Sequence, residues 1–166
     1  DNVTKHDTPA PTVLDNNPDA EPRQQKWNYR SAVGCLSYYQ CMVRPDITFA
    51  VQQCTRFCNN PKKDHEEAVK RICRYILKTQ EKGLIMKPDL SRGLECHVDA
   101  DWAGSWNHRS SSDPTSTYSR TGFCITYAGC PLVWKASMQS LIALSTTEAE
   151  YIPLSSALRE VISGIH

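Results

Sequence analysis

Four carboxylates in two short motifs are the side chains of this sequence best suited to chemistry. Asp99 and Asp101 close a predicted strand, and Glu148 and Glu150 open a predicted helix. Carboxylates from a strand end and a neighbouring helix can converge on one divalent cation, and such oxygen clusters suit Mg²⁺. With two ions, one activates water and the other stabilises the leaving oxygen of a phosphodiester. One interpretation of the motifs is therefore metal-dependent phosphodiester cleavage.

The same residues have an ordinary structural interpretation. Thr146 followed by Glu148 and Glu150 is also the composition expected at a helix N-terminus, where acidic side chains favour the positive end of the helix dipole. An Asp-x-Asp sequence at a strand end is often only a turn. Spacing alone leaves both interpretations open.

A second candidate site is a basic helix in the middle of the chain. The residues that could follow a phosphate backbone are Lys62, Lys63, Lys70, Arg71, Arg74 and Lys78. The alternative is that they form a solvated helix face with no partner.

The elements that must position these residues fall into two halves. Residues 1–25 contain four prolines and little periodicity, which predicts an extended linker. Apolar residues at helical spacing, among them Val33, Leu36 and Met42 in the first segment, then predict three helices. These helices cover about residues 29–43, 47–57 and 65–80. Asp46 and Asp64 are the expected N-caps of the second and third.

The second half is typical of strands followed by a helix. Predicted strands cover residues 84–87, 94–99, 121–129 and 131–137, the last two being joined by a hairpin at 129–131. Residues 140–163 begin with a β-like run and turn helical near Thr146. The predicted class is α/β of the α+β type, with helices over 26–93 and a sheet with a flanking helix over 94–166.

Composition and charge limit the possible classes of protein. The 166 residues, 40% hydrophobic, suffice for one medium domain or two small units. Formal charge is −2 over residues 1–28, +6 over 29–93 and −3 over 94–166. This suits a nucleic-acid-facing platform beside a carboxylate cluster, and equally two oppositely charged units that pack together.

Other whole-chain features favour an intracellular protein, cytoplasmic or nuclear. No apolar run is long enough to span a bilayer, and the polar, proline-containing start does not have the pattern of a signal peptide. The eight cysteines include no C-x-x-C pair and fall largely in apolar or helical patterns, which favours free thiols over zinc ligands or disulfides.

Four motifs in order, VDADWAG, SRTGFC, PLVWKAS and LSTTEAEY, resemble the ribonuclease H domain of copia-type retrotransposons. The helices before them resemble the thumb and connection helices of the preceding reverse transcriptase, and the match covers about residues 27–163. The resemblance implies a truncated mixed sheet with flanking helices. It also implies Mg²⁺-dependent hydrolysis of the RNA strand of an RNA–DNA hybrid.

The resemblance also assigns roles to residues. It implies that Asp99 is the first metal-bridging aspartate and Glu150 the helix glutamate, with Glu148 the second choice and Asp101 peripheral. Three tryptophans are expected in the core rather than as stacking platforms: Trp102, Trp106 and Trp134.

Several departures from the family pattern argue against activity of this chain alone. The family has a third aspartate and a fourth ligand on later elements, whereas this sequence ends at His166. Pro153 is expected to kink the helix of Glu150, and the segment 137–139 lacks the lysines often found there. The polymerase's catalytic aspartates would lie upstream, so polymerisation is not expected.

Two functions follow as expectations. The first is a retroelement-derived ribonuclease H-like fragment that is inactive as an isolated chain. The alternative is a non-catalytic structural or interaction subunit, whose open sheet edge would pair with a partner protein.

Overall fold

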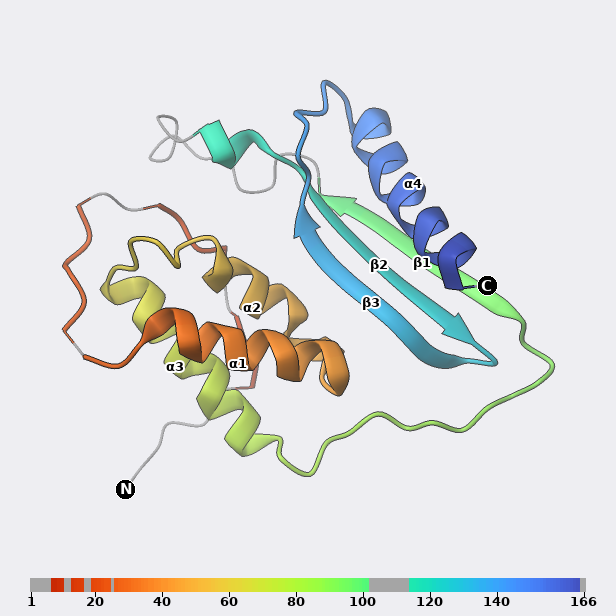
Figure 1. The fold of residues 1–166 in the computed structure, drawn as a ribbon, viewed down its shortest axis with the longest axis horizontal. Helices are drawn as coiled ribbons and strands as arrows, with labels where there is room; N and C mark the ends of the chain where they lie inside the picture. The colour runs from red at the N-terminus through yellow and green to blue at the C-terminus, as the bar shows by residue number, and fades with distance from the viewer. Residues whose placement is uncertain (1–6, 11–12, 17–18, 25, 102–113, 165–166) are drawn as a thin grey trace. The chain divides into compact units, whose positions relative to one another are not determined.

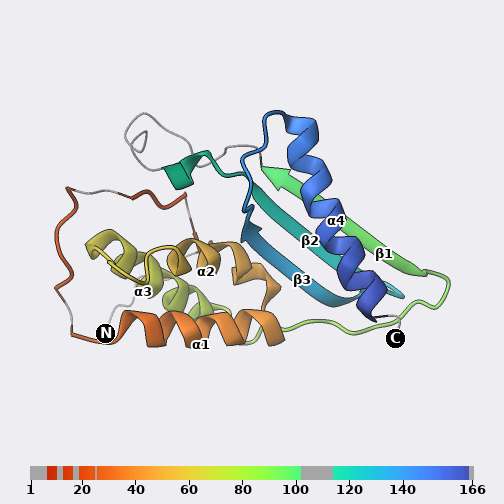
Figure 2. The ribbon, with the colours of Figure 1, turned by 45° about the horizontal axis from the view of Figure 1, so that its top comes forward.

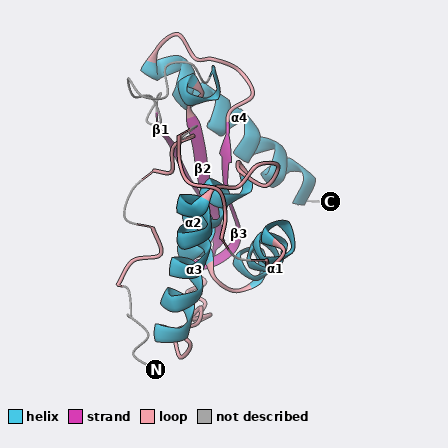
Figure 3. Ribbon diagram, turned by 90° about the vertical axis from the view of Figure 1, so that its left-hand side faces the viewer, coloured by secondary structure: helices cyan, strands magenta, loops and turns pink. Residues whose placement is uncertain are grey.

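The computed structural model divides the chain into two compact units, residues 1–84 and 85–166 (Figure 1). Helices make up the first unit, and a three-stranded sheet with a long helix makes up the second (Figure 3). The predicted α+β class is confirmed. The structure describes residues 7–10, 13–16, 19–24, 26–101 and 114–164.

Unit 1 contains the three predicted helices. They are α1 (Tyr29–Met42), α2 (Thr48–Thr55) and α3 (Lys63–Lys78). The core contains most of the apolar residues that the spacing selected: Val33, Leu36, Ile47, Ala50, Val51, Cys54, Val69 and Ile72. Met42 was expected among them but is 56% exposed. It lies six residues after Leu36, which at 3.6 residues per turn is well off the buried face.

Neither predicted aspartate is an N-cap. The Asp46 carboxylate accepts hydrogen bonds from the Arg44 guanidinium at 2.8 Å and from the Tyr75 hydroxyl at 2.8 Å. A short 3-10 turn, η1 (Pro45–Ile47), places Asp46 before the start of α2. Asp64 lies inside the first turn of α3, so it too is past the capping position.

The second unit is an antiparallel sheet in the order β1-β2-β3, crossed by one helix (Figure 1). Its elements are β1 (Leu94–Asp101), a 3-10 turn η3 (Pro114–Thr117), β2 (Arg120–Tyr127), β3 (Cys130–Met138) and α4 (Thr146–Gly164). The resemblance implied a mixed sheet, but every strand pair in the described residues is antiparallel.

The hairpin between β2 and β3 explains why that pair is antiparallel. Its turn is Ala128–Gly129, one residue earlier than predicted, with φ of 51° and 77°. Two consecutive residues with positive φ match the twist of a tight hairpin, whereas a parallel pair needs a long crossover.

Two predicted β-like segments are not strands. Residues 84–87 and 140–144 have no strand pairing, and Ile85 and Leu144 are 85% and 84% exposed. Short apolar runs favour a strand only where a neighbouring strand and a buried face receive them.

Helix α4 begins at Thr146, as predicted, and packs on one face of the sheet (Figure 2). Ala157 forms a small core with Phe123 and Ile125 of β2, against which Val98 of β1 also packs. We call this the helix-covered face and the opposite side the outer face.

Pro153 lies inside α4 and does not end the helix. Proline lacks the N–H that would bond the carbonyl four residues earlier, which is that of Ala149. The side chain of Gln139 replaces this donor, because its Nε2 donates to the Ala149 oxygen at 2.8 Å. The helix therefore continues through buried Pro153 to Gly164.

Candidate functional site

The two carboxylates of β1 lie on the outer face of the sheet. Asp99 is opposite Gly122 and Asp101 is opposite Arg120 in the β1–β2 register, and both aspartates are exposed. Successive side chains of a strand point to opposite faces. Since Val98 packs on the helix-covered face, Asp99 and Asp101 project away from α4.

The start of α4 is held at the end of the sheet where β1 finishes. Gln139 is buried and donates from Nε2 both to the Ala149 oxygen at 2.8 Å and to Thr121 Oγ1 at 3.3 Å. Thr121 lies opposite Ala100 near the end of β1. The structure thus brings the end of β1 and the start of α4 to one end of the sheet. The aspartates of β1 lie on the outer face, whereas α4, which carries the glutamates, lies on the opposite face.

Glu148 serves as part of a helix cap. Its Oε2 accepts from the Leu144 N–H at 2.8 Å, while Ser145 Oγ accepts from the Glu148 N–H at 3.1 Å. The Ser145 bond is the N-cap half of a capping box, and the Glu148 carboxylate takes the N–H of Leu144, the residue before the cap, so both contacts fit the structural interpretation of the motif. Glu150 is exposed on the same turn of α4 and is the better-placed of the two glutamates for a role outside the helix.

These residues do not fit a magnesium centre as they stand. Among residues that the structure describes, no three His, Cys, Asp or Glu side chains are grouped to hold one ion. Asp99 faces away from the helix that carries Glu150, so a shared ion would require one of them to change direction.

The outer face of β1 is negatively charged along its length. Every second side chain of β1 lies on this face: Glu95, His97, Asp99 and Asp101. The Oε2 atom of Glu95 lies 2.6 Å from the Arg92 guanidinium and 3.6 Å from the His97 ring. The adjacent guanidinium of Arg92 holds the pKa of Glu95 below its usual value. Such a row repels a phosphate backbone unless cations lie between them.

Within unit 1, two of the basic side chains of α3 pair with acids of the same helix. Lys70 Nζ lies 2.9 Å from Glu66 and 2.7 Å from Glu67, and Arg74 lies 3.8 Å from Glu67. The carboxylate of Glu67 raises the pKa of Lys70. These residues are thus partly neutralised rather than simply solvated.

Other basic side chains of α3 contact the N-terminal segment. Lys63 Nζ lies 2.6 Å from Glu21, Arg71 donates to Thr8 through two nitrogens at 3.1 Å each, and Lys78 pairs with Asp7. Backbone contacts join them at the helix start, where Lys62 bridges to Pro22 and the Lys63 N–H donates to the Glu21 oxygen at 3.0 Å.

The role of this N-terminal segment was missed from the sequence. Its signal was the charge pattern, because a segment of net −2 precedes one of net +6. Of the tryptophans, Trp134 is half-buried on β3, while Trp102 and Trp106 lie outside the described residues. The eight cysteines are free thiols. No helix in the described ranges has both the length and the apolar character needed to cross a membrane.

Comparison with known proteins places the sequence among retroelements. No family model and no solved structure matches the chain. It is 41% identical over 134 residues to the "Retrovirus-related Pol polyprotein from transposon TNT 1-94" of Nicotiana tabacum, covering 81% of this chain and 9% of that protein. It is 35% identical over 123 residues to the transposon RE1 Pol polyprotein of Arabidopsis thaliana, covering 74% of this chain and 8% of that one.

One relative is short enough to be matched over most of its length. The "Secreted RxLR effector protein 161" of Plasmopara viticola is 36% identical over 134 residues, which cover 81% of this chain and 89% of that protein. The two Pol polyproteins above are far longer, and the chain spans less than a tenth of each. The chain belongs to the family of sequences related to retrotransposon Pol polyproteins.

Proposed function

We propose that this chain is a ribonuclease H-like segment of a retroelement Pol protein that does not by itself hydrolyse RNA–DNA hybrids. Three antiparallel strands followed by a helix, with Asp99 on the first strand and Glu150 on the helix, support the ribonuclease H-like assignment. By the resemblance, Asp99 and Glu150 are the expected Mg²⁺ ligands of such a domain, although their present directions do not converge on one ion.

The direction of the Asp99 side chain is the observation that supports the lack of hydrolysis by this chain alone. A two-metal phosphodiester site needs carboxylates aimed at ions about 4 Å apart. Here Val98 rather than Asp99 points toward α4. The Asp99 carboxylate therefore lies on the face of the sheet opposite the helix that carries Glu150. The described residues of this chain therefore hold no converged ligand set.

A hybrid-cleavage assay tests this proposal. The full chain, Asp99→Asn and Glu150→Gln are incubated with an end-labelled RNA–DNA hybrid and Mg²⁺, with EDTA as the blank. We expect all three to leave the RNA strand intact at the level of the blank. Mg²⁺-dependent cleavage by the unmodified chain that disappears in Asp99→Asn would overturn the inactive half of the proposal.

A second candidate function, a non-catalytic interaction subunit, is favoured by one feature of α4. Apolar side chains also project outward from the helix at the spacing of one stripe: Tyr151, Leu154, Leu158 and Ile162. An exposed apolar stripe of this kind marks a protein-binding surface. The nearby β1 is an edge strand, so a partner chain could also pair with the sheet.

This candidate is tested by co-purification of the full chain from cells that express it. Leu154→Glu with Leu158→Glu should release a protein that the unmodified chain retains. The matched control is Leu77→Glu, at an exposed apolar position of unit 1, and it should retain the partner. Equal retention by all three proteins would exclude the α4 stripe as the docking surface.

A further inference from the structure

The N-terminal segment runs along the whole of α3 in the opposite direction. We call its described residues 7–10, 13–16 and 19–24 the strap. In chain order, strap residues Asp7, Thr8, Asp15 and Glu21 contact α3 residues Lys78, Arg71, His65 and Lys63 respectively. From Lys63 to Lys78 an α-helix advances about 22 Å. The strap therefore contacts three of the six basic side chains that would follow a phosphate backbone: Lys63, Arg71 and Lys78.

The charges of the strap and of α3 offset one another. The strap contains four acidic residues and one basic residue, a net −3. Residues 62–78 contain six basic and three acidic residues, a net +3. Two strap carboxylates, those of Asp7 and Glu21, form ion pairs near the two ends of the helix. The carboxylate of Glu21 raises the pKa of Lys63, as expected of a close pair.

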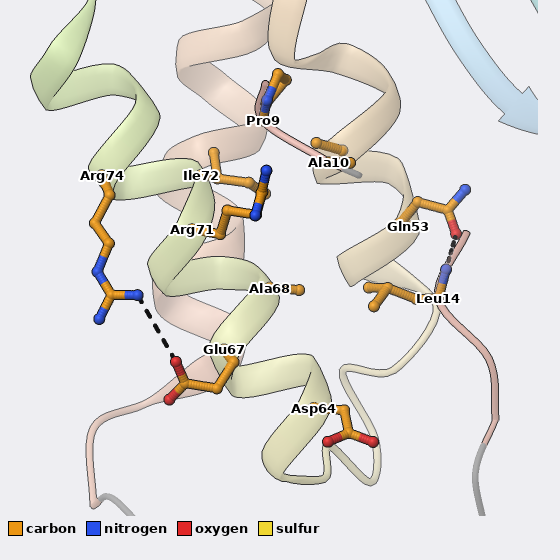
Figure 4. A pocket seen from close by; sticks show the side chains of 11 residues that line it. Pro9, Ala10, Leu14, Gln53, Asp64, Glu67, Ala68, Arg71, Ile72 and Arg74 are labelled. Carbon is orange, nitrogen blue, oxygen red and sulfur yellow. Dashed lines mark hydrogen bonds and ion pairs between the residues drawn. The ribbon is translucent and has the colours of Figure 1, made fainter. Parts of the chain in front are cut away.

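The strap is attached by apolar packing of Ala10 and Leu14 against the core of unit 1 and by polar contacts, of which the ion pairs of Asp7 and Glu21 lie at the surface. Asp7 and Glu21 are 88% and 64% exposed, so their ion pairs are open to competition by other anions and by salt. A cavity of about 330 Å³ lies between the strap and helices α2 and α3, lined in part by Pro9, Ala10 and Leu14 (Figure 4). Leu14 is held there by a 3.2 Å bond from its N–H to Gln53. Because this cavity leaves the contact between the strap and the helices incompletely packed, separating them costs less free energy than separating fully packed surfaces would.

We propose that the strap is a built-in competitor of nucleic acid for the basic face of α3. The carboxylates of Asp7 and Glu21 occupy Lys78 and Lys63 as substitute phosphates, and a nucleic-acid backbone displaces them on binding. The inference rests on the association with nucleic acid implied by the ribonuclease H-like assignment, but not on hydrolysis. Binding of nucleic acid and release of the strap are then two sides of one equilibrium.

Fluorescence anisotropy with a labelled 16-base-pair RNA–DNA hybrid at low salt tests the competition. The full chain is compared with Asp7→Asn/Glu21→Gln, which keeps the shape of both strap side chains and removes their charge. The control is Glu81→Gln/Glu160→Gln, which changes net charge equally outside the strap. We expect the strap variant to bind about three- to tenfold more tightly, since exposed ion pairs contribute modestly, and the control to bind within about twofold of the unmodified chain.

Two further measurements identify the surface and the movement. Lys63→Gln/Lys78→Gln, added to the strap variant, should remove the gain in affinity. Amide hydrogen exchange of strap residues 8–24 should become faster when the hybrid is added. Equal gains in the strap variant and the control, or unchanged strap exchange on binding, would overturn the strap inference alone. Failure of every variant to bind the hybrid would overturn both the inference and the nucleic-acid part of the proposed function.

Discussion

Arg44 is the centre of a hydrogen-bond network in unit 1. Its side chain is 3% exposed and donates to both carboxylate oxygens of Asp46 and to the carbonyl and hydroxyl oxygens of Thr79. Asp46 looked like a helix cap because Asp after proline often is one. A contact between residues 35 positions apart has no local pattern, so it could not be predicted.

Arg44 is expected to be a large single contributor to the stability of unit 1. Arg44→Lys keeps the charge but cannot form the two-point bond to Asp46 together with both Thr79 bonds. We expect the free energy of unfolding to fall by about 2 kcal/mol, as for buried partners left unsatisfied. Urea denaturation followed by circular dichroism measures it.

The matched control for this change is Arg30→Lys. Arg30 is exposed and donates a hydrogen bond of 2.6 Å to Asn59, so its replacement should cost less than about 0.5 kcal/mol. Equal losses in the two variants would show that the Arg44 network contributes no special stability.

His65 is expected to make unit 1 sensitive to mild acid. Its Nδ1 accepts the Lys62 N–H at 3.0 Å, so the proton lies on Nε2, which donates to the Asp15 oxygen at 3.1 Å. Burial lowers the pKa of His65 below 6.5. The stabilising neutral form is therefore fully present above about pH 6.5 and is lost as pH falls through the lower folded-state value.

Urea unfolding at pH 7.5 and pH 5 checks this sign. The unmodified chain should lose stability at pH 5, His65→Asn should lose less, and the control His97→Asn, at an exposed histidine, should behave like the unmodified chain. The same loss in His65→Asn as in the unmodified chain would assign the acid sensitivity to other groups.

At the scale of elements, periodicity predicted the helices better than the strands. Apolar spacing located α1, α2 and α3, because each buries a continuous stripe within its own sequence. The prediction of β-structure at residues 84–87 and 140–144 was wrong, because a strand needs a neighbouring strand that the local sequence does not reveal. The donor that replaces the missing N–H of Pro153 could not be predicted, because Gln139 lies 10 residues before the carbonyl it bonds.

The Gln139–Ala149 bond should be what permits proline inside α4. Gln139→Leu leaves the Ala149 carbonyl without a donor, at a cost of about 1–3 kcal/mol. In a Pro153→Ala background the helix supplies its own N–H, so the same substitution should cost about 1 kcal/mol less. A double-mutant cycle by urea unfolding measures the difference. Identical costs in both backgrounds would show that Gln139 does not compensate for Pro153.

At the scale of the whole molecule, the charge pattern was the most informative sequence feature. It separated a basic middle from acidic flanks, and the structure shows that the strap's acids contact the basic helix α3. The resemblance named the acidic elements of the second unit, and the family is shown by its relatives. Neither could show which face of β1 carries Asp99, because that depends on strand register.

The two units should be separable by a protease. Residues 84–89 lie outside helices and strands and are mostly exposed, whereas α3 and β1 are ordered elements on either side. Limited trypsin digestion should therefore cut first at Lys82, since trypsin does not cleave the Lys87–Pro88 bond, and give two stable fragments near 9 kDa, on the order of half the chain each. Mass spectrometry identifies the cut. An earlier cut inside α3 or β2 would contradict the division into two units.

Titration of the full chain with Mn²⁺, followed by paramagnetic broadening of amide signals, tests most directly whether Asp99 and Glu150 form one metal site. With their carboxylates on different sides of the sheet, we expect weak broadening near each that reaches half-effect only at millimolar Mn²⁺. Asp99→Asn should then leave the broadening around Glu150 unchanged. Tight one-to-one binding that broadens both regions together, and that either Asp99→Asn or Glu150→Gln abolishes, would contradict this account.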